Sequence, residues 1–185
     1  MGIYSRQGDN GETSELNGSR VSKNGMSIHF IGTADELNCH LGLIKAMISN
    51  EDAWQLSWHS SCRFLEKIQK NMMKVMSHVS DVKNSNFIFT KDDIAEIEKE
   101  IEKLLASHPR LNNIVIPGKN IIEAQIQICR TVARRTERLF FAVNEKMPLC
   151  PEAGAYLNRL SDYLFVLSQQ ESLINVNFIN QVTGI

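Results

Sequence analysis

The chain is poor in the features that mark several large classes of protein. It has only four Pro and ten Gly among 185 residues, too few for a disordered or fibrous chain. No apolar run approaches the length of a membrane span, and the N-terminus has no apolar segment typical of a secretory signal. The 20 basic and 21 acidic residues leave a net charge of −1, without the basic excess typical of nucleic-acid binders. We therefore expect a cytoplasmic protein that binds neither membrane nor nucleic acid.

Cysteine patterns typical of metal sites and disulfide scaffolds are also missing. The four cysteines are widely spread, and no two form a CxxC pair. Reduced thiols are the expectation for such a chain in the cytoplasm. His59 and Cys62 lie three residues apart, but no second pair completes a set of ligands, so ordinary packing is favoured and no metal site is predicted.

The remaining composition is that of a globular domain, with 43% apolar and 22% charged residues. The length fits one domain. We divide it into a Gly-, Ser- and Asn-rich segment over 1–30 that belongs to this domain, a helical bundle over 31–173 and a tail over 174–185.

Apolar residues recur at helical spacing through most of the chain. Leu37, Leu41, Ile44 and Ile48 mark a first helix, which Thr33 and Glu36 would cap together. This start places Asp35 and Glu36 near the positive N-terminus of that helix. Four further helices are expected over 52–82, from Thr90, over 120–144 and from Glu152. The pattern indicates an all-α fold, a five-helix bundle.

The fourth predicted helix carries a dense cluster of charge. Four residues share one face by their spacing: Arg130, Arg134, Glu137 and Arg138. The alternative is a solvated helix face. Four arginines within nine residues of a chain with net charge −1 nevertheless favour a polyanion site.

Two neighbouring patterns accompany this cluster. Ile128, Val132 and Leu139 are predicted to mark the apolar face of the fourth helix; Arg135 would lie among them and need a carboxylate partner. On the fifth helix one edge carries Asn158, Asp162 and Phe165. There Asp162 is predicted to neutralise an arginine of the fourth helix, and Asn158 to orient a ligand through its amide.

The N-terminal segment is a second candidate phosphate site. Residues 5–14 combine glycines, hydroxyls and Arg6, which together offer backbone and side-chain donors to phosphate. The GxxxxGK[ST] spacing of a P-loop is absent. A glycine-rich terminal segment is about as often only a loop.

Together these segments resemble the PduO-type ATP:cob(I)alamin adenosyltransferases. The resemblance rests on three stretches in the same order as in that family: 4–14 with Arg20 and Lys23, then 32–38, then 130–138 with 158–162. Each piece alone is weak, and the combination spans the chain to about residue 170.

The resemblance implies a five-helix homotrimer with active sites between subunits. It implies transfer of the adenosyl group of ATP, taken with Mg²⁺ as substrate, to the Co(I) of cob(I)alamin, giving adenosylcobalamin and triphosphate. Cobalt would attack the ribose 5′ carbon, so the protein would position the substrates and neutralise the leaving triphosphate. A flavoprotein reductase and a B12-dependent enzyme are the implied partners.

The resemblance also assigns roles to individual residues. Catalysis falls to Arg134, with Asp35 and Arg130 as a pair that bridges subunits. Corrinoid binding falls to Asp35, Ile114, Arg130 and Phe165. ATP binding falls to Ser5, Arg6, Gln7, Gly8, Thr13, Ser14, Lys23, Arg134, Arg135, Glu137, Arg138 and Asn158.

The chain departs from the family pattern at several positions, in the N-terminal segment over 5–7 and 15–18 and at three positions in or before the fourth helix. Ile114 stands where the family has Phe, Lys119 where it has a second Gly, and Gln127 where it has His. The alternative function is therefore a paralogue that binds ATP or corrinoid with weak or no transferase activity.

Overall fold

The computed structural model describes residues 4, 6–49, 56–106 and 115–183, and these residues form a bundle of five α-helices. The predicted all-α five-helix fold is confirmed. The helices are α1 (Met26–Ser49), α2 (Leu56–Ser80), α3 (Lys91–Ala106), α4 (Ile121–Asn144) and α5 (Pro151–Thr183), with a short 3₁₀ turn η1 (Ser85–Phe87) before α3. Strands β1 (Glu12–Ser14) and β2 (Arg20–Ser22) pair antiparallel in an N-terminal hairpin, with Thr13 opposite Val21.

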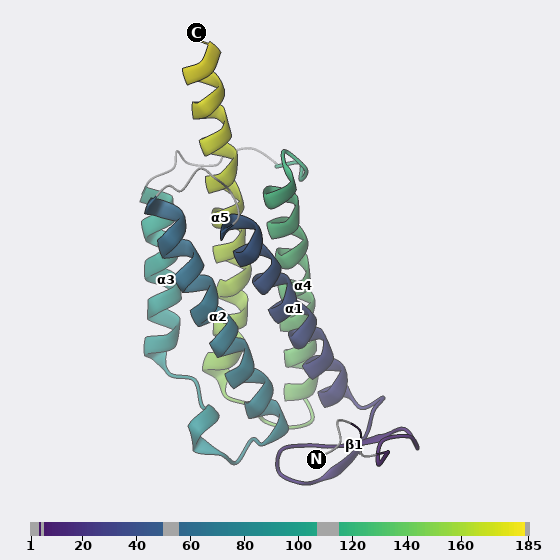
Figure 1. Ribbon diagram of the computed structural model, residues 1–185. Coiled ribbons are helices and arrows are strands. Elements are labelled where there is room, and N and C mark those ends of the chain that lie inside the picture. The colour runs from purple at the N-terminus through teal and green to yellow at the C-terminus, as the bar shows by residue number, and fades with distance from the viewer. Residues whose placement is uncertain (1–3, 5, 50–55, 107–114, 184–185) are drawn as a thin grey trace.

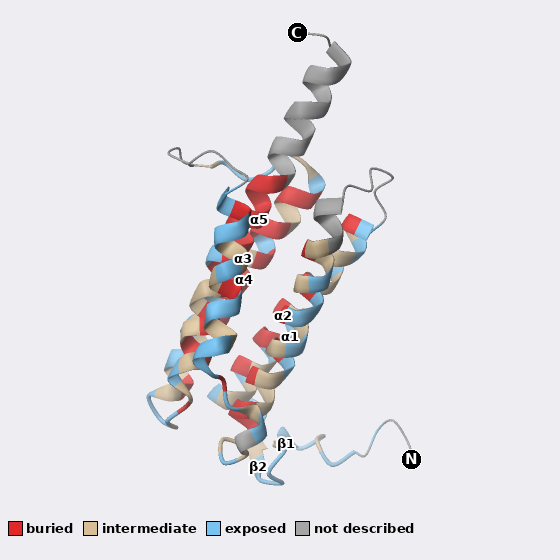
Figure 2. Ribbon diagram, turned by 90° about the vertical axis from the view of Figure 1, so that its left-hand side faces the viewer, coloured by how far each residue is buried: buried red, intermediate tan, exposed pale blue. Residues whose placement is uncertain are grey.

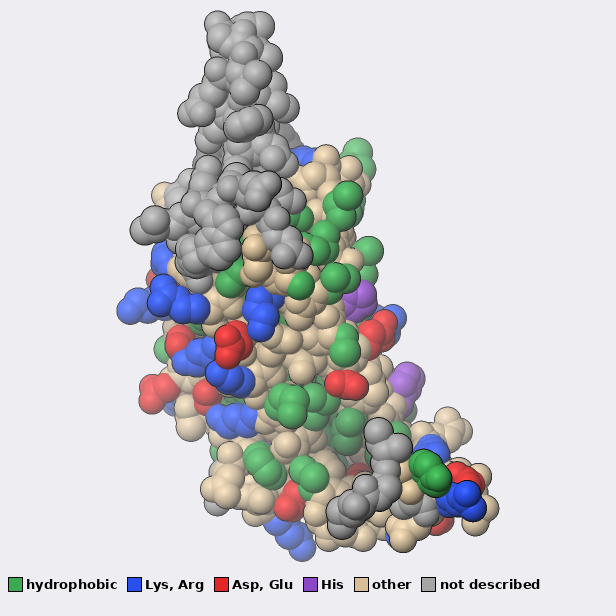
Figure 3. All heavy atoms as spheres, viewed as in Figure 1, with side chains coloured by type: hydrophobic (Ala, Val, Ile, Leu, Met, Phe, Trp, Pro, Cys, Tyr) green, Lys and Arg blue, Asp and Glu red, His purple; other side chains and the backbone are tan. Residues whose placement is uncertain are grey.

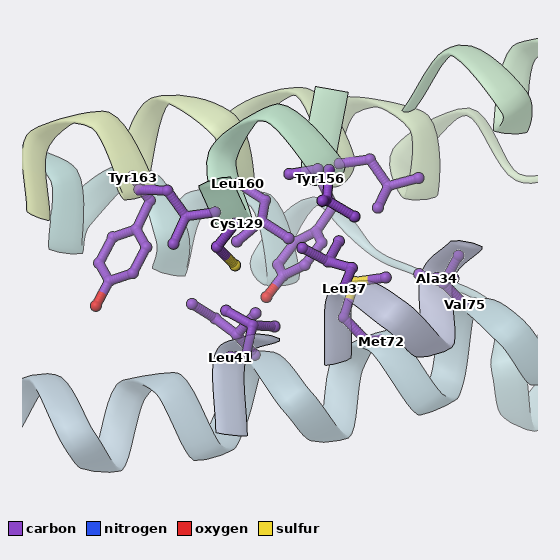
Figure 4. Close-up of a cluster of buried hydrophobic side chains, with 14 of the residues drawn as sticks. Ala34, Leu37, Leu41, Met72, Val75, Cys129, Tyr156, Leu160 and Tyr163 are labelled. Carbon is purple, nitrogen blue, oxygen red and sulfur yellow. The ribbon is translucent and has the colours of Figure 1, made fainter. Parts of the chain in front are cut away.

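The helices lie side by side along their length, and the hairpin lies below the N-terminal end of α1 (Figure 1). α1 packs on α2 and α4, and α5 packs on α4 and α3. The buried residues face the interior of the bundle (Figure 2), where side chains from four helices meet around Leu37, Leu41, Met72, Cys129 and Leu160 (Figure 4). Burial of this continuous apolar core is the main source of stability.

α1 begins at Met26, well before the predicted start at Thr33. Thr33 is buried inside the helix, where its hydroxyl donates to the carbonyl oxygen of His29 at 2.9 Å, so its prediction as an N-cap is wrong. The helix extends because Phe30 and Ala34, both fully buried, continue the apolar repeat toward the N-terminus. Asp35 therefore lies away from the first turn, and the prediction that the helix N-terminus stabilises it is also wrong.

Other helix boundaries agree with the sequence pattern. Thr90 precedes α3, and its backbone N–H and hydroxyl donate to the Asp93 carboxylate at 2.8 and 3.0 Å. The Asn120 side chain caps α4 by accepting from the Glu123 N–H at 2.7 Å. α5 continues to Thr183, through residues whose secondary structure the sequence pattern left open.

No helix within the described residues combines the length and apolarity needed to cross a bilayer. The four cysteines are free thiols.

Two buried tyrosines of α5 offer a matched test of this packing. The Tyr156 hydroxyl accepts from the Asn71 amide at 3.1 Å, whereas the Tyr163 hydroxyl has no hydrogen-bond partner among the described residues. We expect Tyr156→Phe to lower the free energy of unfolding by about 1 kcal/mol, because it removes the partner of Asn71. Tyr163→Phe is expected to be as stable as the wild type or more stable, since it removes an unpartnered buried hydroxyl. Urea denaturation of both variants checks the contrast, and an equal loss in both would contradict it.

Candidate functional site

The N-terminal segment is folded around the side chain of Arg20. The Arg20 guanidinium donates to the Gln7 carbonyl oxygen at 2.7 Å and to the Ser14 hydroxyl at 3.2 Å. It also lies 3.5 Å from the Glu12 carboxylate. These contacts join the loop before β1 to both strands, so one side chain sets the shape of the predicted ATP-binding segment. Sequence reasoning gave Arg20 no such role.

Gly8 and Lys23, both predicted to bind ATP, lie against each other in this segment. A Cβ atom at Gly8 would stand 3.1 Å from Lys23 Nζ and 3.2 Å from the Glu12 carbonyl oxygen. A larger residue would therefore displace the lysine ammonium. Arg6 has a positive φ of 59°, a conformation that costs a non-glycine residue about 1 kcal/mol, and its guanidinium lies 5.6 Å from the centre of the Tyr4 ring.

The hairpin is fixed to one end of the bundle by two hydrogen bonds. The Leu16 N–H donates to the Ser80 hydroxyl at the end of α2, at 2.8 Å. The Ser27 hydroxyl in the first turn of α1 donates to the Glu15 carboxylate at 3.0 Å. Ser5 lies outside the described residues, while Thr13 and Ser14 belong to β1.

α4 presents two arginines to solvent without a carboxylate partner. Arg134 and Arg138 are exposed, and neither forms an ion pair within the described part of the chain. Arg135, also exposed, pairs with Glu36 of α1. The carboxylate partner predicted for Arg135 is thus present, but on the surface.

The predicted apolar face of α4 is wrong in part. Ile128 is 49% exposed, and Arg135 does not lie in the core. Both α1 and α5 pack on α4, so its contact line is set by two neighbours at once. The residues that this line buries include Ile122, Ile126, Cys129, Val132, Ala133, Thr136, Phe140 and Val143.

Asn158 of α5 is held by hydrogen bonds at both ends of its amide. Its Nδ2 donates to Glu137 of α4 at 2.8 Å, and its Oδ1 accepts from Arg159 at 2.7 Å. Arg159 in turn donates to Glu98 of α3 at 2.8 Å. Asp162 is exposed and makes no ion pair among the described residues, so its predicted pairing with an arginine of α4 is not formed.

The residues predicted to meet the corrinoid are distributed over α1, α4 and α5. Asp35 is exposed on α1, and Arg130 is half-buried on α4. Arg130 Nε donates to the Gln127 side-chain oxygen at 2.7 Å, and within the described chain it has no carboxylate partner. Phe165 is half-buried and packs against the core. Ile114 lies outside the described residues.

The connection before α4 is anchored by Glu123, which is fully buried. One carboxylate oxygen accepts from the N–H groups of Gly118 and Lys119, at 2.7 and 3.2 Å. Gly118 has a φ of 109°, which a side chain would strain. Sequence reasoning did not single out Glu123. The available signal is an acidic residue three positions after the capping Asn120.

Comparison with known proteins now identifies the family. Residues 3–171 match the family model described as cobalamin adenosyltransferase. The chain belongs to the cobalamin adenosyltransferase family. It is 34% identical over 169 residues to the corrinoid adenosyltransferase of Citrobacter freundii, covering 91% of this chain and 94% of that protein. It is 33% identical to the cobalamin adenosyltransferase of Cupriavidus metallidurans, covering 90% and 86% of the two chains.

Solved structures share the fold of this family member. A variant of the PduO-type ATP:corrinoid adenosyltransferase of Lactobacillus reuteri, complexed with cobalamin and ATP, superposes with a TM-score of 0.79. The identity is 24%, and the match covers 90% of this chain and 91% of that one. Another variant of the Lactobacillus reuteri enzyme, complexed with ATP, gives a TM-score of 0.80 at 22% identity, over 94% and 95% of the chains.

The adenosyltransferase fold thus brings the predicted residues into two groups. The hairpin group holds Gly8 and Lys23, and the α4 group holds the arginines with Asn158. Within the described ranges no cluster of three or more His, Cys, Asp or Glu side chains is placed to hold a metal ion.

The role of Glu123 as a loop anchor can be tested directly. We expect Glu123→Ala to speed amide hydrogen exchange at Gly118 and Lys119 about tenfold or more, because both amides lose their acceptor. Gln125→Ala is the matched control, since Gln125 lies on the same helix and bonds His40 at 2.7 Å instead of the loop. NMR or mass-spectrometric exchange checks this. Unchanged protection in Glu123→Ala would show that other contacts hold the loop.

Proposed function

We propose that this protein transfers the 5′-deoxyadenosyl group of ATP to the Co(I) of a reduced corrinoid. The products are adenosylcobalamin and triphosphate. The bond that forms joins cobalt to the ribose 5′ carbon, and the bond that breaks joins that carbon to the oxygen of the triphosphate. The electron pair of the new bond comes from Co(I), so no protein nucleophile is required. The protein binds both substrates, orients them in line and stabilises the negative charge of the leaving group.

The observation that carries this proposal is the pair of exposed arginines on α4 that form no ion pair with any described residue. Arg134 and Arg138 lie on one helix face, where their guanidinium groups are available to phosphate oxygens. Arg135 is tethered to Glu36, and Asn158 holds Glu137 beside the same stretch. In this proposal Arg134 contacts the phosphates and assists the transfer, with Arg135, Glu137, Arg138 and Asn158 completing the ATP site on α4 and α5.

The hairpin segment supplies the other part of the ATP site. Lys23 Nζ lies against Gly8, so a lysine ammonium stands beside a segment whose small residues permit close approach of phosphate. The proposed contacts to ATP in this segment are Ser5, Arg6, Gln7, Gly8, Thr13, Ser14 and Lys23.

The corrinoid site of the proposal lies around Arg130. The half-buried Arg130 and the partly buried ring of Phe165 offer one charged and one apolar contact, as a corrinoid with polar edges and an apolar face requires. Asp35 is the proposed partner of Arg130 across a subunit boundary, and Ile114 is the proposed contact at the lower face of the corrin.

We propose a homotrimer in which neighbouring subunits complete each site. Leu43 of α1 and Ile128 and Phe141 of α4 are 48%, 49% and 50% exposed. On the face shown in Figure 3, hydrophobic side chains are exposed over the upper parts of α1 and α4, whereas Lys and Arg gather with Asp and Glu over α2 and α3. Exposed apolar surface of this kind favours association. A cytoplasmic location, a flavoprotein reductase and a B12-dependent enzyme as partners belong to the same proposal.

Arg134→Ala tests the role of the arginine stretch. We expect loss of a charge-assisted contact worth about 1.5–3 kcal/mol, with at least a tenfold fall in the rate of adenosylcobalamin formation from ATP and chemically reduced corrinoid. Arg63→Ala, which removes an arginine from α2, is the control and should keep wild-type turnover. Wild-type turnover in Arg134→Ala would refute its role. A wild-type protein that binds ATP but forms no adenosylcobalamin would favour the binding paralogue.

Light scattering tests the assembly. We expect a particle of three chains, each of 21.0 kDa, at micromolar concentration. Ile128→Glu should shift the population toward single chains, because it places a charge on the exposed apolar surface of α4 without disturbing the core. A wild-type protein that remains a single chain would contradict the proposed trimer.

A further inference from the structure

A buried polar network links α4 to α5 directly beneath Arg130. Gln127 is 4% exposed, and its amide nitrogen donates to the Ser168 hydroxyl at 2.9 Å. Ser168 is fully buried and donates to the Phe165 carbonyl oxygen at 2.7 Å. Gln169, 2% exposed, donates its own amide to Ser168 at 3.0 Å. The remaining end of Gln127, its amide oxygen, accepts from Arg130 Nε at 2.7 Å.

The bonding capacity of Ser168 fixes the orientation of the Gln127 amide. A hydroxyl offers one donor and two acceptor lone pairs. Ser168 uses its donor on Phe165 and both lone pairs on Gln127 and Gln169. It therefore requires a donor from Gln127, which turns the Gln127 oxygen toward Arg130. Arginine has only donors, so it requires that oxygen. Both neighbours demand the same orientation.

From this network we infer that Gln127 is a positioning residue that sets the direction of the Arg130 guanidinium toward the corrinoid. The inference rests on the proposed function, in which Arg130 and Phe165 both contact the corrinoid. Gln127 and Ser168 connect Arg130 to Phe165. Gln127 bonds the Arg130 side chain, and Ser168 bonds the Phe165 backbone. Gln127 holds Nε, and no described residue pairs with the two terminal amino groups of Arg130, so both can reach Asp35 of a neighbouring subunit or the corrinoid.

The hydrogen bond from Arg130 to Gln127 reduces the conformational entropy that Arg130 loses when the corrinoid binds. A half-buried arginine has several rotatable bonds, and fixing it during substrate binding costs entropy. A hydrogen bond from Nε to a buried amide whose nitrogen is itself held by Ser168 fixes the guanidinium before the corrinoid arrives. Since an amide does not titrate, this preorganisation does not change with pH across the neutral range.

Gln127→Met is the first test, because Met resembles Gln in length but can neither accept from Arg130 nor donate to Ser168. We expect kcat/KM for reduced corrinoid to fall about tenfold, with the KM for ATP within twofold of wild type. The 15N-labelled wild-type protein should show a slowly exchanging Arg130 Nε–H signal, assigned by its loss in Arg130→Lys. That signal should exchange rapidly in Gln127→Met. Gln125→Met on the same helix is the control. It should change neither kcat/KM for the reduced corrinoid nor the exchange rate of the Arg130 Nε–H.

Gln127→His is the second test and does not depend on how well Gln127→Met folds. A neutral imidazole can accept from Arg130 with one nitrogen and donate to Ser168 with the other, whereas an imidazolium can only donate. We therefore expect turnover near wild type at pH 8 and a loss as pH falls through the histidine pKa, about 6.5 in the absence of other influences. The wild-type profile should have no matching step.

The outcomes separate the inference from the function on which it rests. A wild-type protein without transfer activity would refute the proposed function, while the Arg130 Nε–H signal would still report on Gln127. An active wild type with unchanged corrinoid kcat/KM in Gln127→Met would overturn the inference. Parallel losses for ATP and corrinoid, or the same pH profile in Gln127→His and wild type, would also overturn it and leave Gln127 a purely structural role.

Discussion

The site depends on the packing of α4 between α1 and α5. The buried line of α4 consists mainly of apolar side chains, with polar residues at Glu123, Gln127 and Thr136, and it fixes how the helix is rotated about its axis. That rotation leaves Arg134 and Arg138 on the opposite, exposed side. Since burial of apolar surface is the largest favourable term in folding, the direction of the arginines follows from the core.

The polar contacts around α4 differ in how strongly they constrain the geometry of its side chains. The Arg135–Glu36 pair is exposed, and such pairs contribute little to stability because water screens them. Its effect is to tie Arg135 of α4 to α1. The amide network of Gln127 and Ser168 is buried, so removing a member leaves an unpartnered polar group in the core. The network is therefore the more stringent constraint on geometry.

The departures from the family pattern have local structural counterparts in this adenosyltransferase. Lys119, at the position where the resemblance implies a second glycine, donates its N–H to Glu123, so the connection before α4 is held by a buried carboxylate. Gln127, at the position where the resemblance implies a histidine, bonds both Arg130 Nε and the Ser168 hydroxyl. Both positions thus retain a defined set of hydrogen bonds, a property expected of a site that must hold its ligands in place.

Sequence patterns alone predicted the five helices, the start of α3 after Thr90 and the limits of α4, because these depend on local periodicity and capping. The order of short motifs along the sequence was also enough to indicate the family and the candidate residues. The predicted start of α1 at Thr33 was wrong. Burial of Phe30 and Ala34 extends the helix toward its N-terminus, and local capping signals do not report such burial.

Tertiary structure decided the remaining features, because they depend on contacts between residues far apart in the chain. It placed Arg135 on the surface against Glu36, and it left Asp162 without the arginine expected for it within the described chain. It also showed that Arg20 shapes the hairpin and that Glu123 anchors the connection before α4. Helical spacing gives the face on which a side chain lies, but its partner depends on how neighbouring helices pack, which spacing along one helix does not specify.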